Sequence, residues 1–170
     1  MADDHTLSDA KRRKFLIKVT SVVGVAGVAA ACLPFIDSMN PSADVLAKAT
    51  TEVDLSGIPE NGVHIVAWQG KPVFVYHRTQ AGIKAMEASN GVLDPEPDQQ
   101  RVKQPEWLVV LGICTHMGCV PNKSDAGWLC PCHGSEYDDS GRVVRGPAPK
   151  NLEVPPYTFI AADKIIIGKA

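Results

Sequence analysis

Four cysteines and two histidines fall in two short stretches of this 170-residue chain, at spacings typical of metal ligands. Residues 114–119 read Cys-Thr-His-Met-Gly-Cys, and residues 130–135 read Cys-Pro-Cys-His-Gly-Ser. Each stretch therefore supplies at least one thiol and one imidazole. Two thiolates and two imidazoles bind zinc tetrahedrally, and they also hold a [2Fe-2S] cluster with two cysteines on one iron and two histidines on the other.

Three features favour the cluster over zinc. The short Cys-x-His spacing differs from the cysteine and histidine pairs of zinc fingers. Each stretch has a spare cysteine, Cys119 or Cys132, and a disulfide between them would tie the two stretches together in an exported, oxidising location. Ser135 and Tyr137 carry hydroxyls able to reach a bridging sulfide and a ligand sulfur, where hydrogen bonds raise the reduction potential.

The amino-terminal region has the features of a membrane signal. Five of the 17 Lys and Arg residues lie in the first 18 positions. Residues 12–18 (RRKFLIK) resemble a twin-arginine export signal, which serves proteins that are exported already folded. Residues 19–36 carry no charge and would span about 27 Å as a helix, close to the thickness of a bilayer core. The positive-inside rule places residues 1–18 in the cytoplasm.

A cleaved or lipidated signal is the alternative to an anchor, because residues 29–32 read Ala-Ala-Ala-Cys. The lipoprotein pattern usually has Leu three positions before the cysteine, where this chain has Ala29. An uncleaved single-pass anchor is therefore favoured.

The rest of the chain predicts a mainly β protein, because it combines short β-rich runs with 14 Gly and 13 Pro in the whole sequence. We expect a small antiparallel β domain with one short helix at residues 79–88, capped by Thr79, and a loop at residues 93–104. The expected strands are residues 64–68, 72–76, 107–113, 128–129, 158–160 and 164–167.

Three regions are expected along the chain. Residues 1–38 hold the cytoplasmic amino terminus, the twin-arginine signal and the transmembrane helix. Residues 39–50 form a hinge or tether, and residues 51–170 form the metal-binding domain, with ligand loops at 114–119 and 130–137. The net charge of −2 gives no basic footprint for nucleic acid.

Together these motifs resemble the Rieske iron–sulfur subunit family of the cytochrome bc1 complex (ubiquinol–cytochrome c reductase), of the alphaproteobacterial or mitochondrial kind. The resemblance covers nearly the whole chain, including the Ala-rich segment 43–49 and residues 146–149, which are similar to the family's proline loop over the cluster. It implies one Rieske-type [2Fe-2S] cluster per subunit, a Cys119–Cys132 disulfide, and tuning of the cluster by Ser135 and Tyr137. The ligands that it implies are Cys114, His116, Cys130 and His133. One departure is Met117, where the family usually has leucine.

The resemblance also implies a function. His133 first, with His116 also exposed, would meet ubiquinol at cytochrome b, and the chain would take up one electron and one proton. It would pass the electron to cytochrome c1 in the respiratory chain and so contribute to proton translocation, as a subunit of quinol–cytochrome-c reductase. The implied setting is a dimeric bc1 complex in the bacterial inner membrane, with the Rieske domain on the periplasmic side.

Three other functions remain as alternatives. Soluble Rieske ferredoxins and oxygenase components lack the anchor and the extra cysteine pair. Another anchored Rieske system, such as arsenite oxidase or a menaquinol-using bc complex, would share the twin-arginine route, whereas Ser135 together with Tyr137 favours a potential matched to ubiquinol. A zinc-stabilised exported binding module would be colourless.

Overall fold

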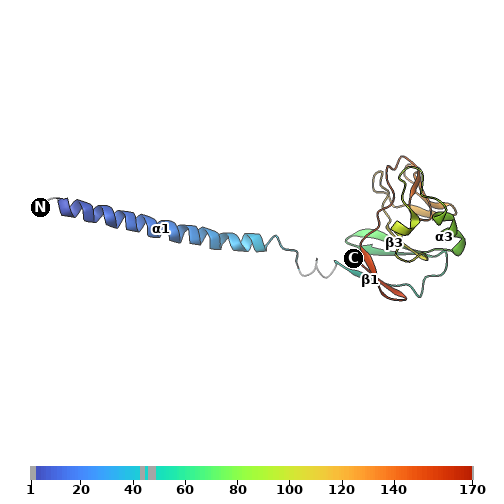
Figure 1. Cartoon of the computed structure of the whole chain (residues 1–170), viewed down its shortest axis with the longest axis horizontal. Helices are drawn as coiled ribbons and strands as arrows, with labels where there is room; N and C mark the ends of the chain where they lie inside the picture. The colour runs from blue at the N-terminus through green and yellow to red at the C-terminus, as the bar shows by residue number, and fades with distance from the viewer. Residues whose placement is uncertain (1–2, 43–44, 46–48, 170) are drawn as a thin grey trace. The chain divides into compact units, whose positions relative to one another are not determined.

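The computed structural model describes residues 3–42, 45 and 49–169, and the chain divides into two compact units, Met1–Val45 and Leu46–Ala170. The first unit contains the long helix α1, Asp3–Asp37 (Figure 1). Its part Asp9–Asp37 is long and apolar enough to cross a membrane, with a mean hydropathy of 2.1 in its most apolar window and none of that window buried. A single long apolar helix near the amino terminus is therefore confirmed.

The helix α1 ends at Asp37, four residues before Pro41. The amide of Ser38 donates to the carbonyl of Pro34 at 2.9 Å, which closes the last turn after Asp37. The predicted tether, residues 39–50, falls largely on residues 43–44 and 46–48, which lie outside the described residues. The tether therefore stays a prediction.

The described part of the second unit, called the head here, is built from three antiparallel sheets and two short helices. The sheets have the strand orders β1-β10-β9, β2-β3-β4 and β5-β6-β7-β8. In Figure 1, β1 lies beside the red carboxyl-terminal hairpin, with which it pairs through β10. The strands are β1 Thr51–Asp54, β2 Val63–Trp68, β3 Lys71–His77, β4 Trp107–Leu111, β5 Asn122–Ser124, β6 Gly127–Leu129, β7 Glu136–Tyr137, β8 Val143–Arg145, β9 Tyr157–Ala161 and β10 Lys164–Ile167.

The expected mainly β fold is confirmed, and so is each of the six expected strands, with small shifts at the ends. The sequence did not predict β1, β5, β7 or β8. Each has four residues or fewer. Such short segments have little periodicity of their own and become strands because a neighbouring strand pairs with them.

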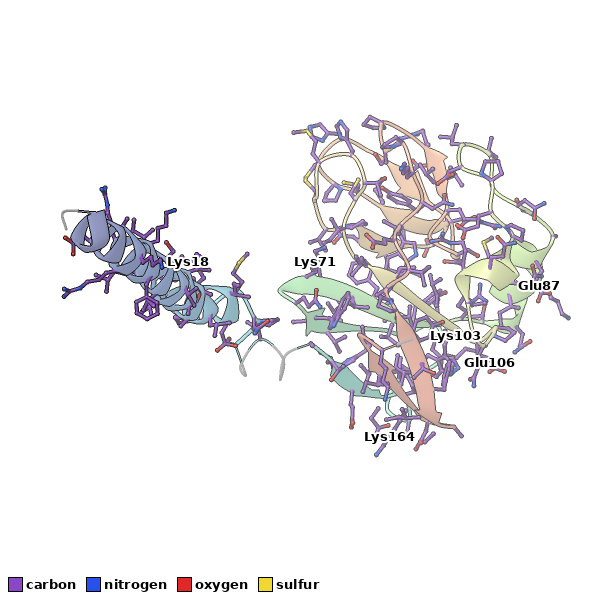
Figure 2. The ribbon with its side chains drawn as sticks, turned by 60° about the vertical axis from the view of Figure 1, so that its left-hand side comes forward. Lys18, Lys71, Glu87, Lys103, Glu106 and Lys164 are labelled. Atoms are coloured by element: carbon purple, nitrogen blue, oxygen red, sulfur yellow. A yellow bond between two sulfur atoms is a disulfide. The ribbon has the colours of Figure 1, made fainter. Side chains whose placement is uncertain are left out.

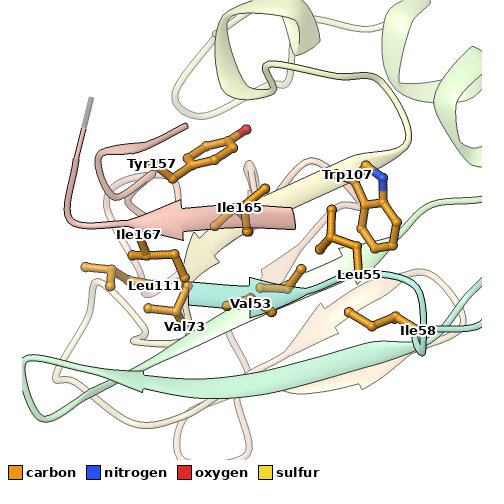
Figure 3. Close-up of a cluster of buried hydrophobic side chains, with 11 residues drawn as sticks. Val53, Leu55, Ile58, Val73, Trp107, Leu111, Tyr157, Ile165 and Ile167 are labelled. Atoms are coloured by element: carbon orange, nitrogen blue, oxygen red, sulfur yellow. The ribbon is translucent and has the colours of Figure 1, made fainter. Parts of the chain in front are cut away.

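The strands β3 and β4 form the centre of the head, because both of their faces are buried. On β3, Val73 and Val75 join one hydrophobic cluster, whereas Phe74 and Tyr76 join a second. Successive side chains on a strand point to opposite faces, so one strand serves both clusters. The first cluster fills the space toward β1 and β10 (Figure 3), and the second includes the buried cysteines Cys114 and Cys130.

The two helices of the head differ in how well the sequence predicts them. Helix α3, Gln80–Glu87, begins after Thr79, whose hydroxyl accepts a hydrogen bond from the amide of Gly82 at 3.0 Å, so the expected helix and its cap are confirmed. Helix α4, Asp98–Arg101, lies inside the stretch expected as a loop, and the expectation of one helix was therefore wrong. The side chains of Asp98 and Arg101 are buried, so tertiary contacts stabilise this single turn.

Gly127 allows two strands of the third sheet to approach closely. It has a φ of 126°, and a β-carbon at this position would lie 2.1 Å from the carbonyl oxygen of Tyr137. We expect Gly127→Ala to lower the free energy of unfolding by about 2 kcal/mol or more, because both the backbone conformation and the contact become strained. Denaturant unfolding of the full chain in detergent measures the change.

Gly57→Ala is the matched control, because nothing lies within 4 Å of its added β-carbon. It should change the free energy of unfolding by less than about 0.5 kcal/mol. Equal stability of the two variants would contradict the close approach at Gly127.

Candidate metal centre

The first ligand loop, residues 114–119, and the first six residues of the second, 130–135, share one pattern of backbone hydrogen bonds. In each, the amide of the first residue donates to the carbonyl of the sixth, and the amide of the fifth donates to the carbonyl of the first. The N···O distances are 2.8 and 2.9 Å in the first loop and 2.8 and 3.0 Å in the second. The fifth residue is Gly118 or Gly134, with φ of 85° and 73°, a conformation that favours glycine. The shared Gly at the fifth position thus has a structural reason.

The structure brings the four expected ligand residues into one region. Cys114 and Cys130 are free thiols, each only 2 % exposed. The imidazole rings of His116 and His133 lie 4.8 Å apart between centroids, at an interplanar angle of 86°. Among the described residues, none forms a hydrogen bond with the buried Nδ1 of His116. A buried polar atom without a partner is costly, and a bond from this nitrogen to a metal would satisfy it.

The spare cysteines form a disulfide. Cys119 and Cys132 are bonded at an S–S distance of 2.15 Å and link the first loop to the second. Their sulfurs and that of Cys130 lie within 4.8 Å of one another. Because the disulfide uses two of the three sulfurs, Cys130 supplies the free thiol in this group.

Removing the disulfide should loosen both loops. The two cysteines are 13 residues apart in sequence, and closing a loop of this length contributes roughly 3 kcal/mol by the chain-entropy estimate. We expect the double variant Cys119→Ala with Cys132→Ala to lose the visible absorption of the expected [2Fe-2S] cluster several times faster on warming than the parent chain. The control is Cys32→Ala, an exposed thiol on α1, which should bleach at the parental rate. If all three proteins lost their visible absorption at the same rate, the disulfide would not stabilise the two loops.

Tyr137 contacts one of the buried thiols directly. Its hydroxyl donates to the Sγ of Cys114 at 3.2 Å and accepts a hydrogen bond from the amide of Thr115 at 3.1 Å. Burial raises the pKa of the Cys114 thiol. Hydrogen bonds to the sulfur, of which the bond from Tyr137 has the largest effect, lower this pKa by more than burial raises it, so the pKa is below its ordinary value. Burial and the hydrogen bond to Cys114 raise the pKa of Tyr137 to about 12, so the phenol remains a donor at neutral pH.

Ser135 is the sixth residue of the stretch 130–135, and its carbonyl accepts the hydrogen bond from the amide of Cys130. It is fully buried, and its Oγ accepts a hydrogen bond from the amide of Ala148 at 3.0 Å. Its hydroxyl is also among the groups that lower the pKa of the Cys114 thiol. The segment 146–149, expected to cover the site, thus contacts it through Ala148, which is itself 3 % exposed.

Thr115, which the sequence did not single out, joins three parts of the site, because its amide bonds Tyr137 and its hydroxyl donates to the carbonyl of Lys150 at 2.6 Å. Its position between Cys114 and His116 was the available signal.

Met117 is 72 % exposed, so the apolar side chain at the tip of the loop faces outward.

Residues 48–157 match the family of the Rieske [2Fe-2S] domain. The chain belongs to this family. Residues 2–42 of this Rieske chain match a second family, described as "Ubiquitinol-cytochrome C reductase Fe-S subunit TAT signal", which agrees with the expected twin-arginine signal and with anchoring in a membrane.

This Rieske chain is similar to known proteins over most of its length. It is 50 % identical to the ubiquinol-cytochrome c reductase iron-sulfur subunit of Rhodospirillum rubrum, over 97 % of this chain and 98 % of the relative. It is also 50 % identical to the mitochondrial Rieske subunit of the cytochrome b-c1 complex of Neurospora crassa, over 91 % of this chain and 69 % of the relative. A solved hyperthermophilic respiratory complex III contains a similar chain, with a TM-score of 0.59, 28 % identity and coverage of 88 % of this chain and 97 % of that one.

The cofactor of this family is a Rieske-type [2Fe-2S] cluster, and the residues of the site fit it. Two buried thiols, a half-buried imidazole with an unsatisfied Nδ1 and an exposed imidazole form the mixed donor set that such a cluster requires. The zinc alternative, which the spacing alone left open, is set aside.

Proposed function

We propose that this Rieske chain is the iron–sulfur subunit of a ubiquinol–cytochrome c reductase. It takes one electron and one proton from ubiquinol and passes the electron to cytochrome c1, which contributes to proton translocation. The observation that carries the proposal is the pair of imidazoles. His133 is exposed, and its ring centroid lies 4.8 Å from that of half-buried His116, next to two buried thiols. A redox site with a protonatable group at the surface suits a quinol.

The proposed ligands are Cys114 and Cys130 on one iron and His116 and His133 on the other. When bound, the cluster supplies a one-electron acceptor. The histidines hold the proton, because an imidazole that binds a metal through one nitrogen keeps the second free for a hydrogen bond. His133, the more exposed of the two, accepts a hydrogen bond from the quinol hydroxyl. Moving a proton together with an electron leaves no isolated charge in an apolar pocket.

Ser135 and Tyr137 are the proposed tuning residues. Tyr137 remains protonated at neutral pH, because burial raises its pKa to about 12, and it donates to the Cys114 sulfur at 3.2 Å. A hydrogen bond to a ligand sulfur favours the reduced, more negative state, so it raises the reduction potential. A high potential is what oxidation of ubiquinol requires.

The proposed partners are cytochrome b, cytochrome c1 and ubiquinol, within a dimeric complex. Residues 39–50 serve as a tether that keeps the head near both cytochromes at a high effective concentration. The proposed anchor, residues 1–38, has its basic end in the cytoplasm and the head, residues 51–170, in the periplasm, supported by the basic cluster at residues 11–18. An impermeant amine reagent should label the exposed lysines of the head in intact spheroplasts.

Electron paramagnetic resonance of the assembled complex tests the function. We expect a rhombic [2Fe-2S] signal of low average g after reduction with ascorbate, altered when an inhibitor occupies the quinol site. A signal that needs dithionite would favour a low-potential or menaquinol-linked Rieske protein. A colourless protein containing zinc would refute the cluster.

A further inference from the structure

Three arginines of the head are buried. Arg78, Arg101 and Arg142 are 1 %, 3 % and 0 % exposed. By contrast, the charged side chains of the head that Figure 2 labels are all exposed: Lys71, Glu87, Lys103, Glu106 and Lys164. Removing a guanidinium from water costs several kcal/mol unless a partner compensates, so buried arginines indicate a network with a specific structural task.

Each buried arginine contacts the turn at residues 138–142. Arg142 is part of the turn, and its Nε donates to the carboxylate of Asp138 at 2.7 Å. The Nε of Arg101 donates to the carbonyl of Ser140 at 2.6 Å, and an Nη of Arg78 reaches the Ser140 hydroxyl at 3.5 Å. Side chains from β3's end and from α4 therefore meet at one turn.

Asp98 is the acid that joins these elements. It is 2 % exposed, and its two carboxylate oxygens accept hydrogen bonds from Arg78 at 2.7 and 3.1 Å. The same carboxylate accepts a hydrogen bond from the hydroxyl of Ser140. Helix α4 thus holds the turn through two side chains, Asp98 at the hydroxyl of Ser140 and Arg101 at its carbonyl. The two-point ion pair with Arg78 supports the contact made by Asp98.

The turn directly follows Tyr137 in the chain. Strand β7 has two residues, Glu136 and Tyr137, and its pairing with β8 shifts register between them. On its other side β7 pairs with β6, where Trp128 is opposite Tyr137. Because both ladders have only two residue pairs, what holds residue 138 also restrains the backbone of Tyr137. Asp138 is fixed within the turn, because its carboxylate accepts hydrogen bonds from the amides of Ser140 and Arg142, both at 2.9 Å.

The geometry points to a positioning role. We propose that Asp98, acting through Ser140, keeps the hydroxyl of Tyr137 on the sulfur of Cys114 and thereby holds the reduction potential high. The inference rests on the proposed function, in which this hydrogen bond tunes the cluster. Hydrogen bonds weaken steeply when distance and angle depart from their optimum, and functional groups must be held to about 0.5 Å. Asp98 itself contacts no proposed ligand among the described residues.

A double-variant experiment tests this role. The experiment uses three single variants of the full chain within the assembled complex: Ser140→Ala, Asp98→Asn and Tyr137→Phe. Two double variants combine Tyr137→Phe with Ser140→Ala or with Asp98→Asn. The midpoint potential is measured by redox titration of the resonance signal. We expect Ser140→Ala and Asp98→Asn to lower the midpoint by part of the Tyr137→Phe shift. Neither should lower it further once the phenol hydroxyl is absent.

Val109→Ala is the control for loss of stability. Val109 is fully buried in the other hydrophobic cluster, so its truncation should destabilise the head and leave the midpoint unchanged. If Asp98→Asn does not accumulate, Ser140→Ala decides, because it removes a single hydroxyl. A wild-type midpoint in Ser140→Ala, or an equal shift with and without Tyr137→Phe, would overturn the role. Loss of the proposed function is a separate result: no Rieske signal in the parent complex.

Discussion

Replacing Cys130 with serine should abolish the cluster. The thiol of Cys130 is buried, and the nearby sulfurs of Cys119 and Cys132 are used by the disulfide. A serine hydroxyl is not deprotonated near neutral pH and is a poor ligand for iron, so no neighbouring group can take its place. Iron and acid-labile sulfide in the purified full chain should fall from about two of each per chain, the content of a [2Fe-2S] centre, to none.

Cys32→Ser is the matched control, because it removes the third free thiol of the described chain, an exposed one on α1. This variant should retain the full iron content and an unchanged resonance spectrum. If Cys130→Ser kept its iron while Cys32→Ser lost it, the ligand assignment would be wrong.

Tyr137→Phe should lower the midpoint potential and slow quinol oxidation. The substitution removes one hydroxyl, which donates to the Cys114 sulfur at 3.2 Å, and leaves the ring in place. A hydrogen bond to a charged acceptor contributes about 1.5 kcal/mol or more, and for a one-electron couple about 1.4 kcal/mol corresponds to roughly 59 mV. Only the part of this energy by which the bond is stronger in the reduced state changes the midpoint, so loss of the bond should shift the midpoint downward by up to about 60 mV.

The rate of quinol oxidation by the complex should fall with the lost driving force, by up to about tenfold if the full 1.4 kcal/mol reaches the transition state. Tyr157→Phe is the control, because that hydroxyl accepts a hydrogen bond from the amide of Lys103 in the other half of the head. It should leave both midpoint and rate unchanged. A midpoint that does not move in Tyr137→Phe would show that the phenol does not tune the site.

The residues proposed to bind the cluster could be singled out in the sequence because their signal is local. Each ligand loop encloses its thiol and imidazole within six residues and has glycine in the fifth position, where the backbone takes a positive φ. The anchor is equally local, since the absence of charge in residues 19–36 is a property of composition. Ser135 and Tyr137 follow so closely after Cys130 that their nearness to the site could be expected.

What holds these residues in place was decided by tertiary structure. Thr115 bonds Tyr137 22 positions away, and Asp98 bonds Ser140 42 positions away. No periodicity in the sequence indicates such contacts. Residues 93–104 were expected to form a loop because they are polar and hold two prolines, and a four-residue helix such as α4 has no hydrophobic pattern that would have shown it. The sequence by itself determined which atoms are proposed to bind the cluster, because the type and spacing of candidate ligands follow directly from the order of residues. Only the folded head determined how firmly those atoms are oriented. Buried charges are stable when distant segments supply their hydrogen-bond partners, and short strands are stable when distant strands pair with them.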